Sequence, residues 1–183
     1  MVVQPKLVTV DEFEQYIAQS ENRERLFELI DGEIVEKVPT EPHGVVTGTT
    51  YRILDEFLDD HPIGRVTVET RYRPADDQYN NRIPDVSFVL GNKPLQWEGA
   101  INFIPDLCVE IQSPDDSPKS MGEKAAFYLA NRAQMVWLIY PRQRIVEVIT
   151  ATYRELLTEN DTLNGGDVLP GFEVPVKNFF RRL

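Results

Sequence analysis

The sequence predicts an α/β (α+β) domain built on a central mixed β-sheet flanked by helices. First, a helix-like segment separates two apolar strand-like runs, residues 106–112 and 135–140, which is the order expected of a crossover between parallel strands. Second, two further strand-like runs meet at Asp31-Gly32, the strongest short hairpin signal. Third, 183 residues with 42% hydrophobic and 27% charged side chains suit one hydrophobic core, so we expect a single domain over residues 1–183.

The first third of the chain is expected to form a helix, a hairpin and a second helix. Thr9 and Glu12 match a capping box, with Val8 and Phe13 placed for a hydrophobic staple, and predict a helix over 10–18. The β-rich runs 25–30 and 33–38 form the hairpin around Asp31-Gly32. Apolar residues at helical spacing then predict a helix over 43–60.

The remainder is expected to contain most of the sheet. Strands are predicted over 65–73 and 82–90, with Pro84 at a sheet edge or bulge, and an irregular segment covers 91–105. Ser117 and Pro118 suit the start of a helix that continues to about residue 131. After the buried strand 135–140, a more exposed strand pair and a tail that packs back on the domain complete the chain.

Composition limits the compartment and the partners. The only cysteine, Cys108, allows no disulfide within the chain and lies in an apolar run, as a small buried side chain would. The N-terminal residues 1–13 lack signal-peptide features and no run approaches the ~20 apolar residues of a membrane span, so we expect a cytoplasmic protein.

The net charge of −11 argues against tight, nonspecific nucleic-acid binding. However, residues 1–60 hold 14 acidic and 5 basic side chains, so most of this excess lies in the first third of the chain. The remaining residues are close to neutral. A nuclease with local basic contacts is therefore compatible with the composition.

The segment 106–124 is the strongest candidate for chemistry. Strand alternation places Leu107, Val109 and Ile111 on one face, and Cys108, Glu110 and Gln112 on the other. An ionised carboxylate in an apolar strand needs a partner, and the sequence offers Asp85 on an earlier strand and Lys124 on the following helix.

Two carboxylates and a lysine suit metal-assisted phosphodiester hydrolysis. If their strands are neighbours, Asp85 and Glu110 would stand ~5 Å apart on one face of the sheet. The backbone carbonyl of Ile111 would then supply a third hard oxygen for Mg²⁺ or Mn²⁺. Lys124 would orient the attacking water and stabilise the developing charge.

The segments RIPDVSFV, PDLCVEIQSP, EKAAFYLANRAQMVWLIYPRQRIVEV and LPGFEVPV resemble the Uma-two family of restriction endonuclease-like proteins, as does FELIDGEIVE. The likeness covers nearly the whole chain. It implies a PD-(D/E)XK nuclease-like domain with a restriction-endonuclease-like core, in which Pro84-Asp85 matches the PD element and Glu110-Ile111-Gln112 the (D/E)XK element. Gln112 replaces the usual lysine, and Lys124 stands where the family shows that residue; Glu28 and His43 are possible accessory residues.

The resemblance implies a Mg²⁺- or Mn²⁺-dependent endonuclease acting on DNA and leaving a 5′-phosphate, with Asp85, Glu110, Gln112 and Lys124 as the catalytic set. Arg71, Arg73 and Arg82 are possible phosphate contacts, although a strand face of mixed charge is the simpler interpretation. Glu110 and Lys124 could equally form only a structural salt bridge, and Glu28 could be a structural partner. A catalytically silent interaction module on the same fold and a hydrolase of small phosphoesters stay open, and a homodimer is plausible.

Overall fold

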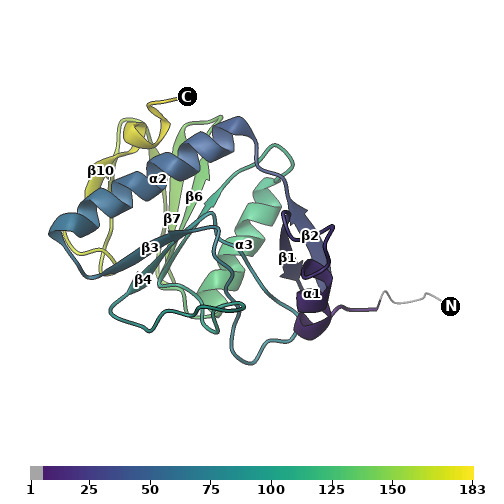
Figure 1. The fold of residues 1–183 in the computed structure, drawn as a ribbon. Coiled ribbons are helices and arrows are strands. Elements are labelled where there is room, and N and C mark those ends of the chain that lie inside the picture. The colour runs from purple at the N-terminus through teal and green to yellow at the C-terminus, as the bar shows by residue number, and fades with distance from the viewer. Residues whose placement is uncertain (1–5) are drawn as a thin grey trace. The chain divides into compact units, whose positions relative to one another are not determined.

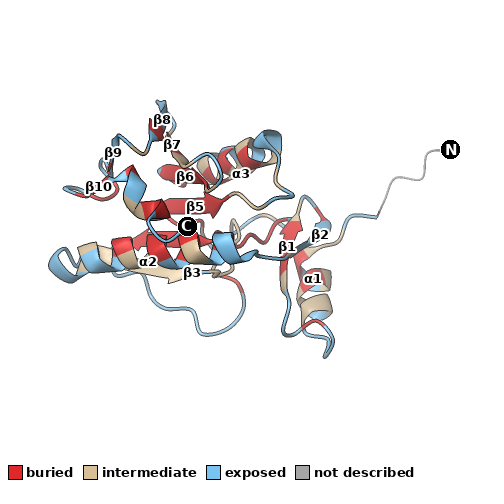
Figure 2. Ribbon diagram, turned by 90° about the horizontal axis from the view of Figure 1, so that it is seen from above, coloured by how far each residue is buried: buried red, intermediate tan, exposed pale blue. Residues whose placement is uncertain are grey.

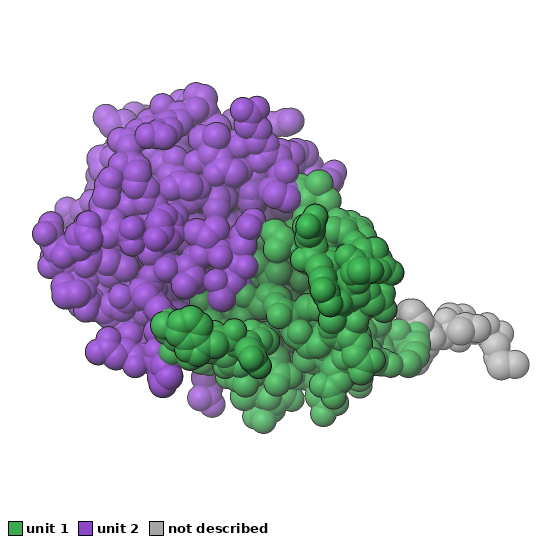
Figure 3. Space-filling view, viewed as in Figure 1, with its two compact units in different colours: residues 1–38, 71–83, 95–103 green, residues 39–70, 84–94, 104–183 purple. Residues whose placement is uncertain are grey.

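The structure is a computed structural model that describes residues 6–183. The N-terminal segment 1–13, for which no signal peptide was predicted, therefore lies partly outside the described residues. The chain forms two compact units, coloured separately in Figure 3. Unit 1 contains residues up to 38, 71–83 and 95–103, and unit 2 contains residues 39–70, 84–94 and 104–183. That the whole chain folds as one domain stays a prediction.

Unit 1 is a helix and a hairpin with two further segments. The helix α1 (Val10–Ile17) begins at Thr9 with the predicted capping box to Glu12. The strands β1 (Leu26–Ile30) and β2 (Glu33–Lys37) pair antiparallel around Asp31 and Gly32, whose positive φ angles of 49° and 81° are those of a tight hairpin turn. Isolated bridges connect residues 71–83 to β1 and to residue 101. A small core forms between helix and hairpin from Val10, Phe13, Phe27 and Leu29.

Unit 2 contains the central sheet (Figure 1), whose strands lie in the order β3-β4-β5-β6-β7-β8. Their bounds are β3 Gly64–Val68, β4 Val86–Leu90, β5 Leu107–Ile111, β6 Met135–Tyr140, β7 Ile145–Ile149 and β8 Arg154–Thr158. β5 and β6 pair parallel and every other neighbouring pair is antiparallel. The helix α3 (Pro118–Ala130) connects the parallel pair, which confirms both the mixed sheet and the predicted crossover.

Helices cover the two faces of this sheet (Figure 2). Val46, Ile53 and Leu54 of α2 (Glu41–Asp60) belong to the main core with Leu107, Val109 and Ile111 of β5 and with the C-terminal segment. The opposite face, which carries Cys108 and Glu110, faces α3, whose Tyr128 hydroxyl reaches Glu110. The alternation predicted for β5 is therefore confirmed.

The C-terminal segment packs back on the core, as predicted, and adds elements that periodicity did not indicate. β9 (Thr162–Asn164) and β10 (Glu173–Pro175) form a two-stranded sheet. A 3₁₀ helix, η1 (Val176–Phe180), follows and buries Phe179 and Phe180 in the core.

The predicted strand over 65–73 is wrong beyond its first half, because β3 ends at Val68. Glu69 has a φ of +47°, which breaks the pleat, and its N–H donates to the carbonyl of Asp85 at 3.3 Å. Tyr72 then bridges to Arg82 and Ile101 instead of extending β3. The strand expected over 82–90 likewise starts only at Val86, after Pro84, which cannot donate to a ladder.

Among the described residues, no helix has both the length and the apolar character that crossing a bilayer would require.

Candidate active site

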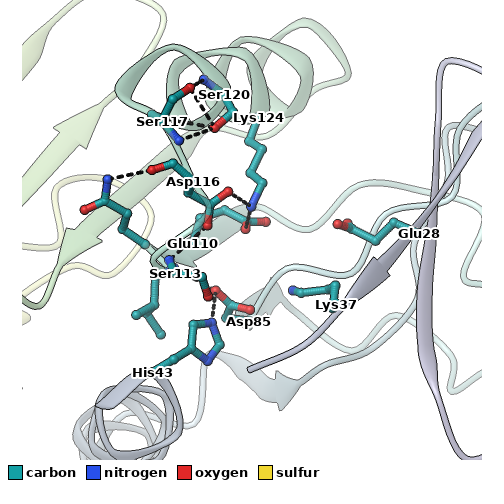
Figure 4. Close-up of polar contacts among 12 residues, drawn as sticks. Glu28, Lys37, His43, Asp85, Glu110, Ser113, Asp116, Ser117, Ser120 and Lys124 are labelled. Atoms are coloured by element: carbon teal, nitrogen blue, oxygen red, sulfur yellow. Dashed lines mark hydrogen bonds and ion pairs between the residues drawn. The ribbon is translucent and has the colours of Figure 1, made fainter. Parts of the chain in front are cut away.

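Asp85 lies at the point where the chain enters β4, beside the end of β5 (Figure 4). The first β4–β5 pair is Val86 with Val109, and the Asp85 N–H donates to the Val109 carbonyl at 3.0 Å. The Asp85 side chain is 1% exposed, and its Oδ2 accepts from the Ile111 N–H at 2.7 Å. The antiparallel register therefore brings Asp85 to the backbone of the residue that follows Glu110.

Glu110 is fully buried in β5, on the face covered by α3. Its Oε1 accepts from the Tyr128 hydroxyl at 2.6 Å, and its Oε2 lies 3.1 Å from Lys124 Nζ. Both partners come from α3, where Lys124 and Tyr128 are four residues apart and so share a face of the helix. The predicted approach of Lys124 to Glu110 is present in the structure.

Lys124 Nζ also lies 3.2 Å from Asp116 Oδ1, and the Lys124 side chain is only 16% exposed. Asp116 belongs to the turn between β5 and α3, where its Oδ2 accepts from the Ser113 N–H at 2.9 Å. Ser117 is the N-cap of α3 and forms a reciprocal capping box with Ser120. The turn and the cap thus fix the helix turn that carries Lys124.

His43, in the first turn of α2, is buried and contacts Asp85, with 3.1 Å between Nε2 and Oδ2. An ionised carboxylate only accepts hydrogen bonds, so Nε2 carries a hydrogen in this contact. The other ring nitrogen, Nδ1, is 3.5 Å from Thr47 Oγ1. The structure therefore places His43 directly against one of the two predicted metal ligands.

Gln112 follows Glu110 by two residues, and the catalytic role predicted for it stays a prediction. Its side-chain amide donates to the Asp116 carbonyl at 3.1 Å, and its backbone N–H donates to Ile139. This contact supports the β5–α3 turn, in which Asp116 approaches Lys124. Gln112 also lines a pocket of about 600 Å³ together with His43.

The other predicted residues belong to unit 1 and have partners there. Glu28 is 3% exposed and accepts from the Ile83 N–H at 2.7 Å, a contact with the backbone, and its accessory role stays a prediction. Arg71 pairs with Glu14 at 2.9 Å, and Arg73 donates to Asn102. Arg82 is 5% exposed and donates to Asn80. A phosphate contact by any of these arginines stays a prediction.

Sequence reasoning missed Asp116 and Tyr128 as members of this cluster. No role in the site was predicted for Tyr128, but the hydroxyl of a tyrosine on a buried helix face needs a hydrogen-bond partner. Lys124, one turn earlier, marks that helix face as the one that meets Glu110. Asp116 lies in a turn, where no periodicity indicates which way its side chain points.

The cluster suits a hard divalent cation in its chemistry. Its three carboxylates belong to Asp85, Glu110 and Asp116. Its basic groups are the Lys124 amine and the His43 imidazole. No group of three or more His, Cys, Asp or Glu side chains within residues 6–183 has the geometry to hold a metal ion alone. Asp85 and Glu110 would therefore need backbone or water oxygens to complete a coordination shell, which is how Mg²⁺ is commonly bound.

The negative charge of the cluster also acts on Cys108, two residues before Glu110. Burial raises the pKa of the Cys108 thiol well above its ordinary value, and the carboxylates of Glu110 and Asp106 raise it further. This thiol is consequently a protonated, unreactive core group.

The family model Uma2, described as "Putative restriction endonuclease", matches residues 10–177. The chain belongs to the Uma2 family. The resemblance predicted from the residue segments above is thereby confirmed over almost the whole chain. No curated protein matches the sequence.

A solved structure similar to this Uma2 family member is a crystal structure described as a putative nuclease belonging to DUF820 from Anabaena variabilis. The sequences are 24% identical, the alignment covers 95% of this chain and 98% of that chain, and the TM-score is 0.79. At this identity the likeness shows the fold, and it confirms the predicted α+β class with a mixed sheet flanked by helices.

Proposed function

We propose that this protein is a Mg²⁺- or Mn²⁺-dependent endodeoxyribonuclease of the PD-(D/E)XK type. The observation that carries the proposal is the convergence of Asp85, Glu110 and Lys124 in unit 2. Asp85 is bonded to the Ile111 N–H beside Glu110, and the Lys124 amine lies 3.1 Å from the Glu110 carboxylate. Membership of a family described as restriction endonucleases supports the reaction class.

In this proposal Asp85, Glu110 and the Ile111 carbonyl hold the cation. A cation bound there would supply positive charge for the scissile phosphate and would lower the pKa of the attacking water. Lys124, an ammonium paired with Glu110 and Asp116, would donate a hydrogen bond that orients that water and would stabilise the charge that develops, which is the role of the usual lysine at the position that Gln112 occupies. The contact of Lys124 with Asp116 limits the positions of its amine.

Two neighbours keep the carboxylates in place. The Tyr128 hydroxyl donates to Oε1 of Glu110, and His43 donates to Oδ2 of Asp85. Each of these hydrogen bonds uses one acceptor site of a carboxylate, and an ionised carboxylate has about four such sites. We assign positioning roles to Tyr128 and His43, and a turn-supporting role to Gln112.

The test is cleavage of supercoiled plasmid DNA with Mg²⁺ or Mn²⁺, together with calorimetric titration of Mn²⁺. Asp85→Asn and Glu110→Gln keep the side-chain shape but remove the charge, so each is expected to lower cleavage by at least about a hundredfold and to weaken Mn²⁺ binding. Glu123→Gln is the matched control, because Glu123 lies next to Lys124 in α3 but its side chain is 65% exposed.

Equal activity of Asp85→Asn, Glu110→Gln and the control would contradict the residue assignment. A wild-type protein that neither cuts DNA nor binds Mn²⁺ at millimolar concentration would contradict the enzyme itself. The alternative, a silent interaction module on this fold, would then be the better interpretation. Activity on nucleotides or other small phosphoesters without cleavage of DNA would change the substrate class.

A further inference from the structure

Unit 2 also contains the pocket that Gln112 and His43 line. Its volume of about 600 Å³ falls within the range of small-molecule sites. The start of α2, the β5–α3 turn, the β6–β7 turn and the C-terminal residues all contribute to its wall. The predicted catalytic set includes Gln112 but gives the pocket itself no role.

Two arginines give the pocket an anion-binding character. Arg142 comes from the β6–β7 turn and Arg182 from the segment after η1, and both are exposed. Within residues 6–183, neither guanidinium makes an ion pair or hydrogen bond to another side chain, in contrast to Arg144, which pairs with Glu159. Both guanidinium groups can therefore turn toward a ligand. The paired N–H groups of a guanidinium match the spacing of two phosphate oxygens.

The pocket also adjoins the proposed reaction centre. His43 lines its wall and at the same time contacts Asp85, while Gln112 lines it and contacts the turn residue Asp116. A strand whose scissile phosphate lies at Asp85 and Glu110 would extend past His43 into this space. The Glu41 carboxylate also lines the pocket and opposes anion binding.

We infer that this pocket binds a nucleotide of the cleaved strand next to the scissile phosphate, with Arg142 and Arg182 contacting the flanking phosphate. The inference rests on the proposed nuclease function. The size of the pocket fits one nucleotide, and its cationic residues contact the backbone without reading a base edge. The site is thus expected to hold any nucleotide and to add affinity rather than sequence specificity.

Fluorescence anisotropy of 5′-fluorescein-labelled hexathymidylate, with EDTA present, tests binding without cleavage. Arg142→Gln and Arg182→Gln are each expected to weaken binding about five- to tenfold at low salt. Each should also lower the slope of log affinity against log salt concentration by about 0.7, the contribution of one phosphate contact on a single strand. Arg132→Gln is the control, because Arg132 is an exposed arginine beyond the end of α3 and outside the pocket.

Glu41→Gln supplies the opposite perturbation. Removing this carboxylate is expected to tighten binding several-fold without reducing the salt slope, which a damaged fold would not do. Thymidine 3′,5′-bisphosphate should displace the labelled strand, whereas thymidine should not, because it lacks phosphate.

The inference is overturned if wild type does not bind the oligonucleotide, or if the Arg142 and Arg182 variants bind with the affinity and salt slope of Arg132→Gln. These outcomes are separable from the failure of the proposed function. Arginine-dependent binding by a protein that never cleaves DNA would support the pocket and contradict the nuclease. If wild type cleaves DNA but oligonucleotide binding does not depend on Arg142 or Arg182, the nuclease proposal is supported and the nucleotide site in the pocket is contradicted.

Discussion

Replacing Lys124 with methionine removes the cation that faces a fully buried carboxylate. Glu110 has 1% of its side chain exposed, and its Oε2 lies 3.1 Å from the Lys124 amine. Removing one partner of a buried ion pair typically costs about 3–5 kcal/mol, because the remaining charge stays out of water. Since Lys124 is 16% exposed and also meets the partly exposed Asp116, we expect the lower end, about 3 kcal/mol.

The matching change on the other side of the pair should cost much less. Glu110→Gln leaves the Lys124 amine with Asp116, and the amide oxygen still accepts from Tyr128, so we expect a loss of about 1 kcal/mol or less. The double variant contains neither charge and should resemble Glu110→Gln. The coupling free energy in the double-mutant cycle then has a magnitude of about 3 kcal/mol, the cost of Lys124→Met itself.

Urea unfolding in EDTA, followed by circular dichroism, measures all four proteins of this cycle. A Lys124→Met cost below about 1 kcal/mol, or additive single changes, would refute the reasoning, because Glu110 would then not depend on the lysine as a buried ion. Added Mg²⁺ provides a second measurement. At a Mg²⁺ concentration of a hundred times the dissociation constant, the free energy of unfolding of wild type should rise by about 2.7 kcal/mol, and that of Glu110→Gln should rise far less.

Three further predictions concern the same region. Tyr128→Phe deletes the 2.6 Å donor to Glu110 and should lower the free energy of unfolding by about 1–3 kcal/mol in urea titrations, whereas an unchanged midpoint would mean that the hydroxyl contributes nothing. Burial raises the pKa of the Cys108 thiol, so the folded chain keeps a proton that the unfolded chain loses above about pH 8.5. The free energy of unfolding should therefore fall as the pH rises beyond that value, and this thiol should contribute about 1.4 kcal/mol per pH unit to the fall. Cys108→Ala should lack that part of the slope, and an identical pH profile would contradict the assignment. Ser117→Ala removes the cap of α3 and should cost about 1 kcal/mol in thermal or urea unfolding, which Ser117→Asn should largely restore.

Local sequence signals were enough to predict most helices and strands. The caps at Thr9 and Ser117, the Asp31-Gly32 turn and the apolar run of β6 all depend on neighbours within a few residues. The end of β3 did not follow from such signals. The alternation of polar and apolar residues continues past Val68, and only the left-handed backbone of Glu69 interrupts the strand.

The candidate site was predictable to the extent that its geometry is local. The face of β5 that carries Glu110 follows from strand alternation, and the face of α3 that carries Lys124 follows from helical periodicity. The bond from Ile111 to Asp85 joins residues 26 positions apart, and the His43 contact depends on where α2 lies against the sheet. Tertiary packing decides both, and no pattern within a segment encodes it.

The crossover from β5 through α3 has a consequence for how the site can assemble. Glu110, Asp116, Lys124 and Tyr128 all come from one continuous stretch of nineteen residues, 110–128, so closing their contacts costs little chain entropy. Asp85 and His43 join only when distant parts of unit 2 meet. The contacts among Glu110, Asp116, Lys124 and Tyr128 can therefore form early in folding. The contacts of Asp85 and His43 complete the site only when β4 and α2 pack against β5.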